Sequence, residues 1–343
     1  MYESNVLCWR EAPMTDNTDS LQESSTDTLD QTIVDALNEY TTPLSAVTPA
    51  TDHNDLTSLP DKLADTRVVA LGEATHGTRE FFQLKHRFLR YLVSECGLRL
   101  IAFEANFPEA LAINEYIVHG TGDPASALEE VYFWTWQVES MRALLEWLQE
   151  FNRDRPLADR VRFHGIDSQF TQGAVDALRD YFATVDPAYL ESLTPELDAI
   201  ADGGVPLEQA DNPEILLADL DDLVPKLRDR LTAKQQEYVQ ATSDRAWERA
   251  RQHVRILSQA YDRKQAEQAF QQTLDTEKAA IEQLIGHRDQ VMATNVEWLL
   301  EYEDAAQIAI WGHDAHINRT VHTHDESGAT APSSHRIVLK MYW

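Results

Sequence analysis

Four short apolar segments, separated by helical patterns, constrain the fold of this chain more than any other feature. They are residues 68–71, 98–103, 161–167 and 306–311. Each contains a run of aliphatic, β-branched or aromatic residues, as strands do when a parallel sheet buries them on both faces. Parallel neighbours need crossover connections, which are usually helices. The sequence therefore predicts an α/β fold: a mostly parallel sheet with flanking helices and a large helical insertion.

The first of these segments runs directly into a polar turn, Val68 to Gly77, with the sequence VVALGEATHG. Gly72 is expected to end the strand, which leaves Glu73 and His76 in the turn before a helix that starts around Glu80. Open α/β sheets bind ligands at the carboxyl ends of their strands. A carboxylate and an imidazole at this position are therefore candidates for a functional site.

The same pattern recurs at the ends of the other strands. Glu104 follows the second strand, His164 and Asp167 end the third, and His313 and His316 follow the fourth. Because parallel strands share one carboxyl edge, the polar groups of all four strands are expected to gather on one rim. Two imidazoles three residues apart beyond an apolar strand are costly to bury without a task.

Two kinds of hydrolytic chemistry fit such a rim. A histidine oriented by a carboxylate can deprotonate water. Alternatively, histidines and carboxylates can bind a divalent metal that lowers the pKa of a bound water to about 7. Covalent catalysis is less favoured, because the chain has no G-x-S-x-G elbow and neither cysteine lies in a strand-end turn.

Several of these residues also have a structural interpretation. Lys85, in the helix after His76, could supply positive charge to a developing oxyanion, or could be a solvated residue or half of a salt bridge. His164 is as likely to be a buried histidine bonded to the protein as a functional one. Asp167 is favoured as a helix cap. The aromatic stretch 131–152 is expected to be a core helix, although rings near its start could line a pocket.

The charge balance limits the partners. With 29 Lys and Arg against 58 Asp and Glu, the net charge is −29 and the pI is about 4.6. The field of such a chain repels nucleic acid and anionic membrane surfaces, and an acidic surface is typical of proteins from a halophilic, high-salt host. Two cysteines imply no disulfide framework, and no apolar run reaches the roughly 20 residues that span a membrane. Without a signal-peptide pattern, the expected location is the cytoplasm.

The order of the segments predicts the domain organisation. Residues 1–30 are expected to be a disordered acidic tail, and 31–170 the first part of an α/β catalytic core. Residues 171–287 are expected to form the helical insertion, and 288–343 the second part of the core, shortened at its carboxyl end.

Five motifs together resemble the erythromycin esterase family. They are Leu71 to Lys85, Ile101 to Ile117, His164 to Asp167, Met292 to Leu299 and Trp311 to His316. The similarity runs from about Arg67 to about Arg319, in the order and spacing of that family.

The resemblance implies a scaffold of macrolide-lactone esterases, hence a small-molecule ester substrate and a role in antibiotic resistance. In that family the histidine matching His76 is the general base for water, and the acids matching Glu73 and Glu104 are essential. His313 completes the centre, with His316 beside it. The position of Lys85 is arginine in some members, and lysine keeps the charge without the planar fork. No cofactor is expected to be required for this chemistry, and a divalent metal is the alternative.

Two other functions stay open on the sequence. G-E-x-H turns also occur in metal-dependent peptidases and in metal- or haem-binding proteins, which form the first alternative. The ending SSHRIVLKMYW differs from the continuation of the family, so an inactive, truncated esterase homologue is the second. The oligomeric state is not indicated.

Overall fold

The computed structural model describes residues 42–201, 213–272 and 277–317, together with Gln31, Val34, Asp35 and Asn38. The expected tail 1–30 and the expected carboxyl-terminal part beyond residue 317 lie outside the described residues. Residues 1–45 and 46–343 form two separate units. In the first unit the four residues named above are helical, and Gln31 Nε2 donates to Asp35 at 2.9 Å.

The second unit is built on a four-stranded parallel sheet with the strand order β1-β4-β2-β3. The strands are β1 (Val68–Glu73), β2 (Leu100–Asn106), β3 (Arg162–Asp167) and β4 (Ile308–His313). The predicted α/β class is therefore confirmed. The first strand does not end at Gly72 as expected, because Gly72 and Glu73 continue the register of β1 against Gly312 and His313 of β4.

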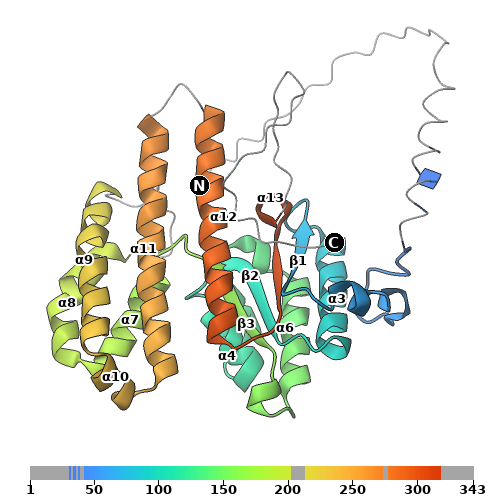
Figure 1. Cartoon of the computed structure of the whole chain (residues 1–343), viewed down its shortest axis with the longest axis horizontal. Coiled ribbons are helices and arrows are strands. Elements are labelled where there is room, and N and C mark those ends of the chain that lie inside the picture. The colour runs from blue at the N-terminus through green and yellow to red at the C-terminus, as the bar shows by residue number, and fades with distance from the viewer. Residues whose placement is uncertain are drawn as a thin grey trace, which may run out of the picture. The chain divides into compact units, whose positions relative to one another are not determined.

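Helices cover both faces of this sheet (Figure 1). They are η1 (Asn54–Leu56), α2 (Leu59–Leu63), α3 (Arg79–Glu95), α4 (Leu111–His119), α5 (Pro124–Glu129), η2 (Trp134–Trp136), α6 (Glu139–Asn152), η3 (Leu157–Asp159), α7 (Gln172–Val185), α8 (Pro187–Ile200), α9 (Pro213–Ala233), α10 (Gln235–Ala241), α11 (Asp244–Gln272), α12 (Glu277–Tyr302) and α13 (Asp314–Ile317). Helices α7 to α11 fall within the expected insertion, whose boundaries stay a prediction.

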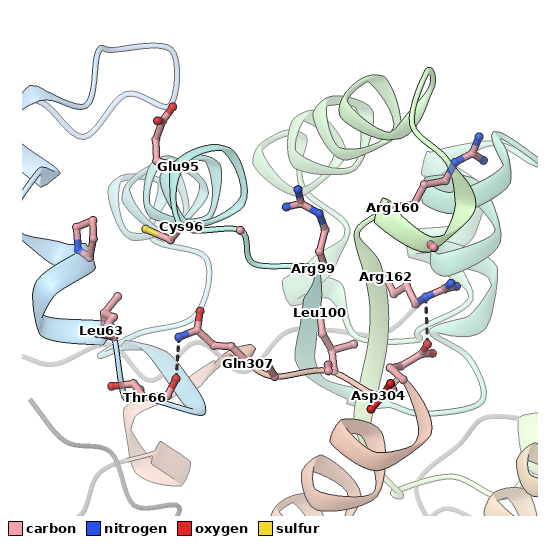
Figure 2. Close-up of a pocket in the computed structure, with 17 residues that line it drawn as sticks. Leu63, Thr66, Glu95, Cys96, Arg99, Leu100, Arg160, Arg162, Asp304 and Gln307 are labelled. Carbon is pink, nitrogen blue, oxygen red and sulfur yellow. Dashed lines mark hydrogen bonds and ion pairs between the residues drawn. The ribbon is translucent and has the colours of Figure 1, made fainter.

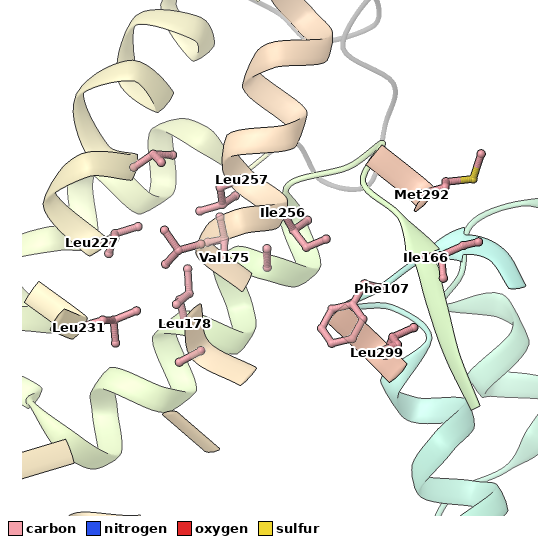
Figure 3. Close-up of a cluster of buried hydrophobic side chains, with 14 of the residues drawn as sticks. Phe107, Ile166, Val175, Leu178, Leu227, Leu231, Ile256, Leu257, Met292 and Leu299 are labelled. Atoms are coloured by element: carbon pink, nitrogen blue, oxygen red, sulfur yellow. The ribbon is translucent and has the colours of Figure 1, made fainter. Parts of the chain in front are cut away.

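Alternate residues of the strands enter two different cores. Even-numbered positions such as Ala70, Ala102 and Ile310 pack with α7 to α9, α11 and α12, as Figure 3 shows for part of this core. Odd-numbered positions such as Leu71 and Trp311 pack with α3 to α6. This alternation is the pleat of a strand buried on both faces. It also turns Glu73 towards α3 and Glu104 towards α12.

Two expected helices differ from the structure. The stretch from residue 131 holds only the 3-10 turn η2 before α6 begins at Glu139, because Tyr132 has a positive φ of 64° that no right-handed helix accepts. The helical pattern from Lys234 to about Phe270 predicts one long helix, but the structure divides it into α10 and α11. The break lies at Thr242, where the backbone leaves the helical region with φ −132° and ψ −95°.

Gly165 is required where β3 meets an irregular part of β2. The register of β2 against β3 shifts between Phe103 and Asn106. A Cβ on Gly165 would lie 2.3 Å from the carbonyl oxygen of Asn106 and 2.4 Å from that of Ala105. We expect Gly165→Ala to lower the free energy of unfolding by about 1–3 kcal/mol, because backbone cannot move aside cheaply.

Chemical denaturation measures this change. The matched control is Gly286→Ala in α12, where an added Cβ meets nothing within 4 Å. The control is expected to raise stability by about 0.5–1 kcal/mol, because alanine is the better helix former. A Gly165→Ala variant as stable as the parent chain would contradict the strand pairing described above.

Candidate active site

The carboxyl edge of the sheet joins Glu73 and His76. Glu73, at the end of β1, is buried, and its Oε1 lies 2.8 Å from His76 Nδ1. An ionised carboxylate only accepts hydrogen bonds, so Nδ1 carries the proton and Nε2 holds a free lone pair. The His76 side chain is 36% exposed. The pair is therefore an imidazole oriented from behind by a carboxylate, with its basic nitrogen towards the open side.

The other oxygen of Glu73 is held from the α3 side of the sheet. Glu73 occupies an odd position of β1, so it faces the core that α3 covers. Lys85 Nζ donates to Glu73 Oε2 at 3.0 Å and to the carbonyl of Gly312 at 3.3 Å. Trp311 Nε1 donates to the same Oε2 at 3.1 Å. Both oxygens of Glu73 are thus engaged, which fixes the carboxylate.

Lys85 lies behind Glu73 rather than on the open side. It is 4% exposed, and its ammonium group lies 4.8 Å from the centre of the Trp311 ring. Burial lowers the pKa of Lys85 to about 8, against the opposing effect of the Glu73 charge. This environment makes Lys85 a positioning residue for Glu73.

Glu104 faces the opposite side of the sheet, towards α12. Its Oε2 accepts from the backbone N–H of His313 at 2.7 Å, which ties β2 to the end of β4. Its Oε1 lies 2.7 Å from a guanidinium nitrogen of Arg288 and 3.3 Å from His316 Nε2. Glu104 is therefore joined to His313 at the end of β4 and to His316 beyond it, and also to Arg288, which the sequence analysis missed.

Arg288 is the centre of this second group. Its guanidinium contacts Asp167 Oδ2 at 2.6 Å and 3.0 Å and His316 Nε2 at 2.8 Å. Asp167 is buried, and although burial alone would raise its pKa, the charge of Arg288 lowers the pKa below its usual value. Asp167 thus forms an ion pair with Arg288, a contact that its expected role as a helix cap does not include. His316 Nδ1 lies 2.7 Å from Asp289.

His313 stands between the two groups. Its Nδ1 accepts from the N–H of Ala315 at 3.0 Å, so Nε2 carries the proton and donates to the carbonyl of Ala74 at 3.1 Å. Its ring centre is 4.9 Å from that of His76. Five of the six predicted residues, namely Glu73, His76, Glu104, His313 and His316, meet along this edge, and the sixth, Lys85, supports Glu73.

Two glycines allow the strand ends to approach so closely. A Cβ on Gly72 would lie 1.9 Å from Asp314 Oδ1, so the turn into α13 leaves no room for a side chain at this position. A Cβ on Gly312 would lie 3.2 Å from Glu104 Oε2. The first motif and the last motif therefore carry glycine next to their acidic and basic residues for steric reasons.

His164, the remaining histidine of the four that the sequence analysis named, lies away from this rim. Its Nε2 is 2.7 Å from Glu303, which also pairs with Arg162 at 3.1 Å and Arg245 at 2.6 Å. Burial alone would raise the pKa of Glu303, but the hydrogen bond from His164 and the positive charges lower it to about 2. This arrangement is a buried ion-pair cluster, and the structural interpretation of His164 fits it.

An aromatic segment, residues 131–137, borders the same edge. The N–H of Phe133 bonds to the carbonyl of Val131 at 2.8 Å around Tyr132, whose φ is +64°, so the three residues form a strained γ-turn. The six-membered ring of Trp134 lies against Gly77, where an added Cβ would be 3.1 Å from it. Large aromatic side chains are thus held next to the His76 turn.

A cavity of about 650 Å³ lies at the opposite edge, where the strands begin (Figure 2). Its lining includes Arg99, Arg160 and Arg162, but these arginines already bond to protein oxygens: Arg99 to Asp159 at 2.8 Å and Arg162 to Glu303 at 3.1 Å. Arg160 donates to the carbonyl of Arg155 at 2.9 Å. The carboxyl edge is the candidate active site, because there the exposed imidazole of His76 is oriented by the buried carboxylate of Glu73.

The alternative of a metal was tested against the side chains. Among residues 42–201, 213–272 and 277–317, no three His, Cys, Asp or Glu side chains converge as metal ligands would. At the rim the carboxylates of Glu104 and Asp167 form ion pairs with Arg288, whose positive charge opposes a cation there.

Among residues 42–201, 213–272 and 277–317, no helix is long and apolar enough to cross a bilayer.

Comparisons with known proteins identify the family and the fold of this chain. The family model described as erythromycin esterase matches residues 93–332. The erythromycin esterase type II of Escherichia coli is 25% identical over 303 residues, which cover 84% of this chain and 70% of that protein. A crystal structure of a Bacillus cereus protein has a TM-score of 0.67 at 24% identity and covers 84% of this chain and 67% of the other.

A structure of the erythromycin esterase EreC in its open conformation has a TM-score of 0.57 at 18% identity, with coverage of 78% and 66%. The chain thus spans about two thirds of the length of these relatives, and the structural likenesses establish the fold.

Proposed function

This chain belongs to the erythromycin esterase family, and we propose that it hydrolyses a carboxylic ester of the macrolide-lactone type with water activated by His76. The observation that carries the proposal is the pair of Glu73 and His76, joined at 2.8 Å with the imidazole on the open side. Resistance to macrolide antibiotics is part of the same proposal. The catalytic roles below belong to it as well.

In the proposed reaction His76 Nε2 takes a proton from water as the water oxygen attacks the ester carbon. The negative charge of Glu73 stabilises the imidazolium that forms. The tetrahedral intermediate then expels the alkoxide, which receives the proton from His76. The products are a carboxylic acid and an alcohol, or one hydroxy acid from a lactone.

The oxyanion of the intermediate needs a hydrogen-bond donor that is not already buried. We propose that His313, whose ring centre lies 4.9 Å from that of His76, supplies it by turning its Nε2–H from the carbonyl of Ala74 to the oxyanion. The ammonium of Lys85 points at Glu73 and Gly312 instead. We therefore assign Lys85 to holding the carboxylate of Glu73 in position, and Glu104 to holding His313 and Arg288 in place.

A pH profile tests the role of Lys85. Its pKa of about 8 leaves it charged below pH 8 and neutral above. If Glu73 needs that charge, kcat/KM should fall about tenfold between pH 7 and pH 9. Lys85→Arg keeps the charge over this range, so its profile is expected to be flat there. An identical alkaline fall in both proteins would contradict this role.

Hydrolysis of erythromycin and of nitrophenyl esters by the purified chain, at low and high salt, tests the proposed activity. Each assay is run with and without a chelator. Turnover that survives the chelator supports His-activated water. Turnover that the chelator abolishes and a divalent metal restores would support the metal route instead, and a folded chain that turns over no ester would contradict the proposal.

A further inference from the structure

We propose that residues 131–137, with Trp134 at their centre, form the wall that binds the apolar part of the substrate next to the scissile ester. The inference rests on the proposed function and names the chemistry of the group that binds: a bulky, uncharged ring system. It assigns substrate selection to a segment outside the acidic and basic motifs.

The segment crosses the whole carboxyl edge of the sheet. At one end Trp134 lies against Gly77, just after β1. At the other end the rings of Tyr132 and Phe133 lie 5.2 Å and 5.5 Å from that of Phe170, just after β3. Because β1 and β3 are the two outer strands of the sheet, the segment spans β4 and β2, which carry His313 and Glu104.

Trp136 anchors the segment to the side chains of the sheet. It is 2% exposed, and its ring centre lies 5.1 Å from Phe103 of β2 and 6.4 Å from Trp311 of β4. The anchor rests on the two central strands, as the crossing requires. A fixed backbone of this kind presents its remaining rings without an ordering cost when a ligand binds.

Two rings are left at the surface. Trp134 is 67% exposed and Tyr132 is 39% exposed, whereas Trp136 of the same segment is buried. An exposed indole beside polar residues is typical of a binding surface for apolar ligands. Because Gly77 directly follows His76, a ring stacked on Trp134 lies beside the proposed general base.

The net charge of the chain further restricts the chemical class of the ligand. A net charge of −29 disfavours an anionic group, and an aromatic face attracts apolar rings or cations. The exposed rings of Trp134 and Tyr132 carry no net charge, so stacking rather than ion pairing would hold the ligand. A neutral alicyclic, aromatic or sugar ring is the chemistry that fits.

The test compares a bulky and a small ester, nitrophenyl cyclohexanecarboxylate and nitrophenyl acetate. Trp134→Ala is expected to raise KM for the bulky ester at least about tenfold and to change kcat/KM for the acetate less than about twofold. Trp134→Phe is expected to recover most of the loss. The matched control is Leu157→Ala, which removes an apolar side chain that is 51% exposed on η3, at the beginning of β3.

Direct binding separates this inference from the proposed hydrolysis. The probe is cyclohexyl methyl ketone, which keeps the ring and carbonyl but has no ester bond, titrated against the parent chain and Trp134→Ala. Weaker binding by Trp134→Ala supports the wall even if no ester is hydrolysed. Equal affinity of the two proteins, no binding by the parent chain, or an equal loss of activity on both esters would overturn the inference.

Discussion

Replacing His76 by alanine is expected to lower kcat for ester hydrolysis about 10³-fold with the fold unchanged, within the range that general-base catalysis contributes. The His76 side chain is 36% exposed and contacts Glu73 at 2.8 Å, so its removal leaves little unfilled space. The loss should appear in kcat rather than in KM, because the imidazole acts on water. Steady-state kinetics at neutral pH and a thermal melt measure both parts of the prediction.

His119→Ala is the matched control for this variant. His119 also lies near a carboxylate, Glu115 at 4.0 Å, and its side chain is 46% exposed on α4. We expect its kcat to equal that of the parent chain. A His76→Ala variant with more than a tenth of the parent activity would remove His76 from the role of general base.

Replacing Arg288 by methionine is expected to cost about 3–5 kcal/mol of stability at neutral pH, because buried carboxylates lose their charged partner. Arg288 bonds to both Glu104 and Asp167, and the latter is 1% exposed. In the parent chain the lowered pKa of Asp167 contributes stability above the usual pKa of an aspartate, and acid removes it. The two proteins should therefore differ most near pH 7 and converge as the pH falls below 4.

A double variant shows whether the unpaired charge causes this loss. Asp167→Asn combined with Arg288→Met removes one of the two stranded carboxylates and should recover part of the stability. Arg142→Met is the control, since Arg142 pairs with Glu146 in the exposed part of α6 and is expected to change stability by less than about 1 kcal/mol. A loss that stays the same as the pH falls from 7 to well below 4 would show that packing, and not charge, explains it.

The sheet could be predicted because its signal is local. Each strand is a short apolar run, and parallel strands must share a carboxyl edge, so Glu73, Glu104 and His313 had to meet wherever the chain order placed them. The strand ends were less predictable. Glu73 and His313 belong to β1 and β4 because they pair with each other, and that pairing joins segments about 240 residues apart.

Arg288 was missed because no local pattern distinguishes it from other helical arginines. Its role depends on the pleat, which turns Glu104 towards α12, and on the length of α12 before the Met292 motif. The alternation within β2 could have indicated the side on which Glu104 needs a cation. It could not have indicated which helix of the long helical region supplies it.

The aromatic segment was predicted as the start of a core helix because large apolar residues at close spacing usually are one. The backbone of Tyr132 at φ +64° breaks that pattern, and a tyrosine gives no sequence signal for a left-handed conformation. Trp136 is in the core as expected, whereas Trp134 is at the surface. The distinction between the two depends on the turn and not on composition.

A single-turnover hydrolysis in ¹⁸O-labelled water, with the chain in excess over the ester, tests the central claim most directly. If water activated by His76 attacks the ester carbon, the carboxylic acid released in the first turnover carries one labelled oxygen and the protein carries none. An unlabelled acid, with the label on Glu73 or Glu104 instead, would show that a protein carboxylate attacks first and would contradict the account.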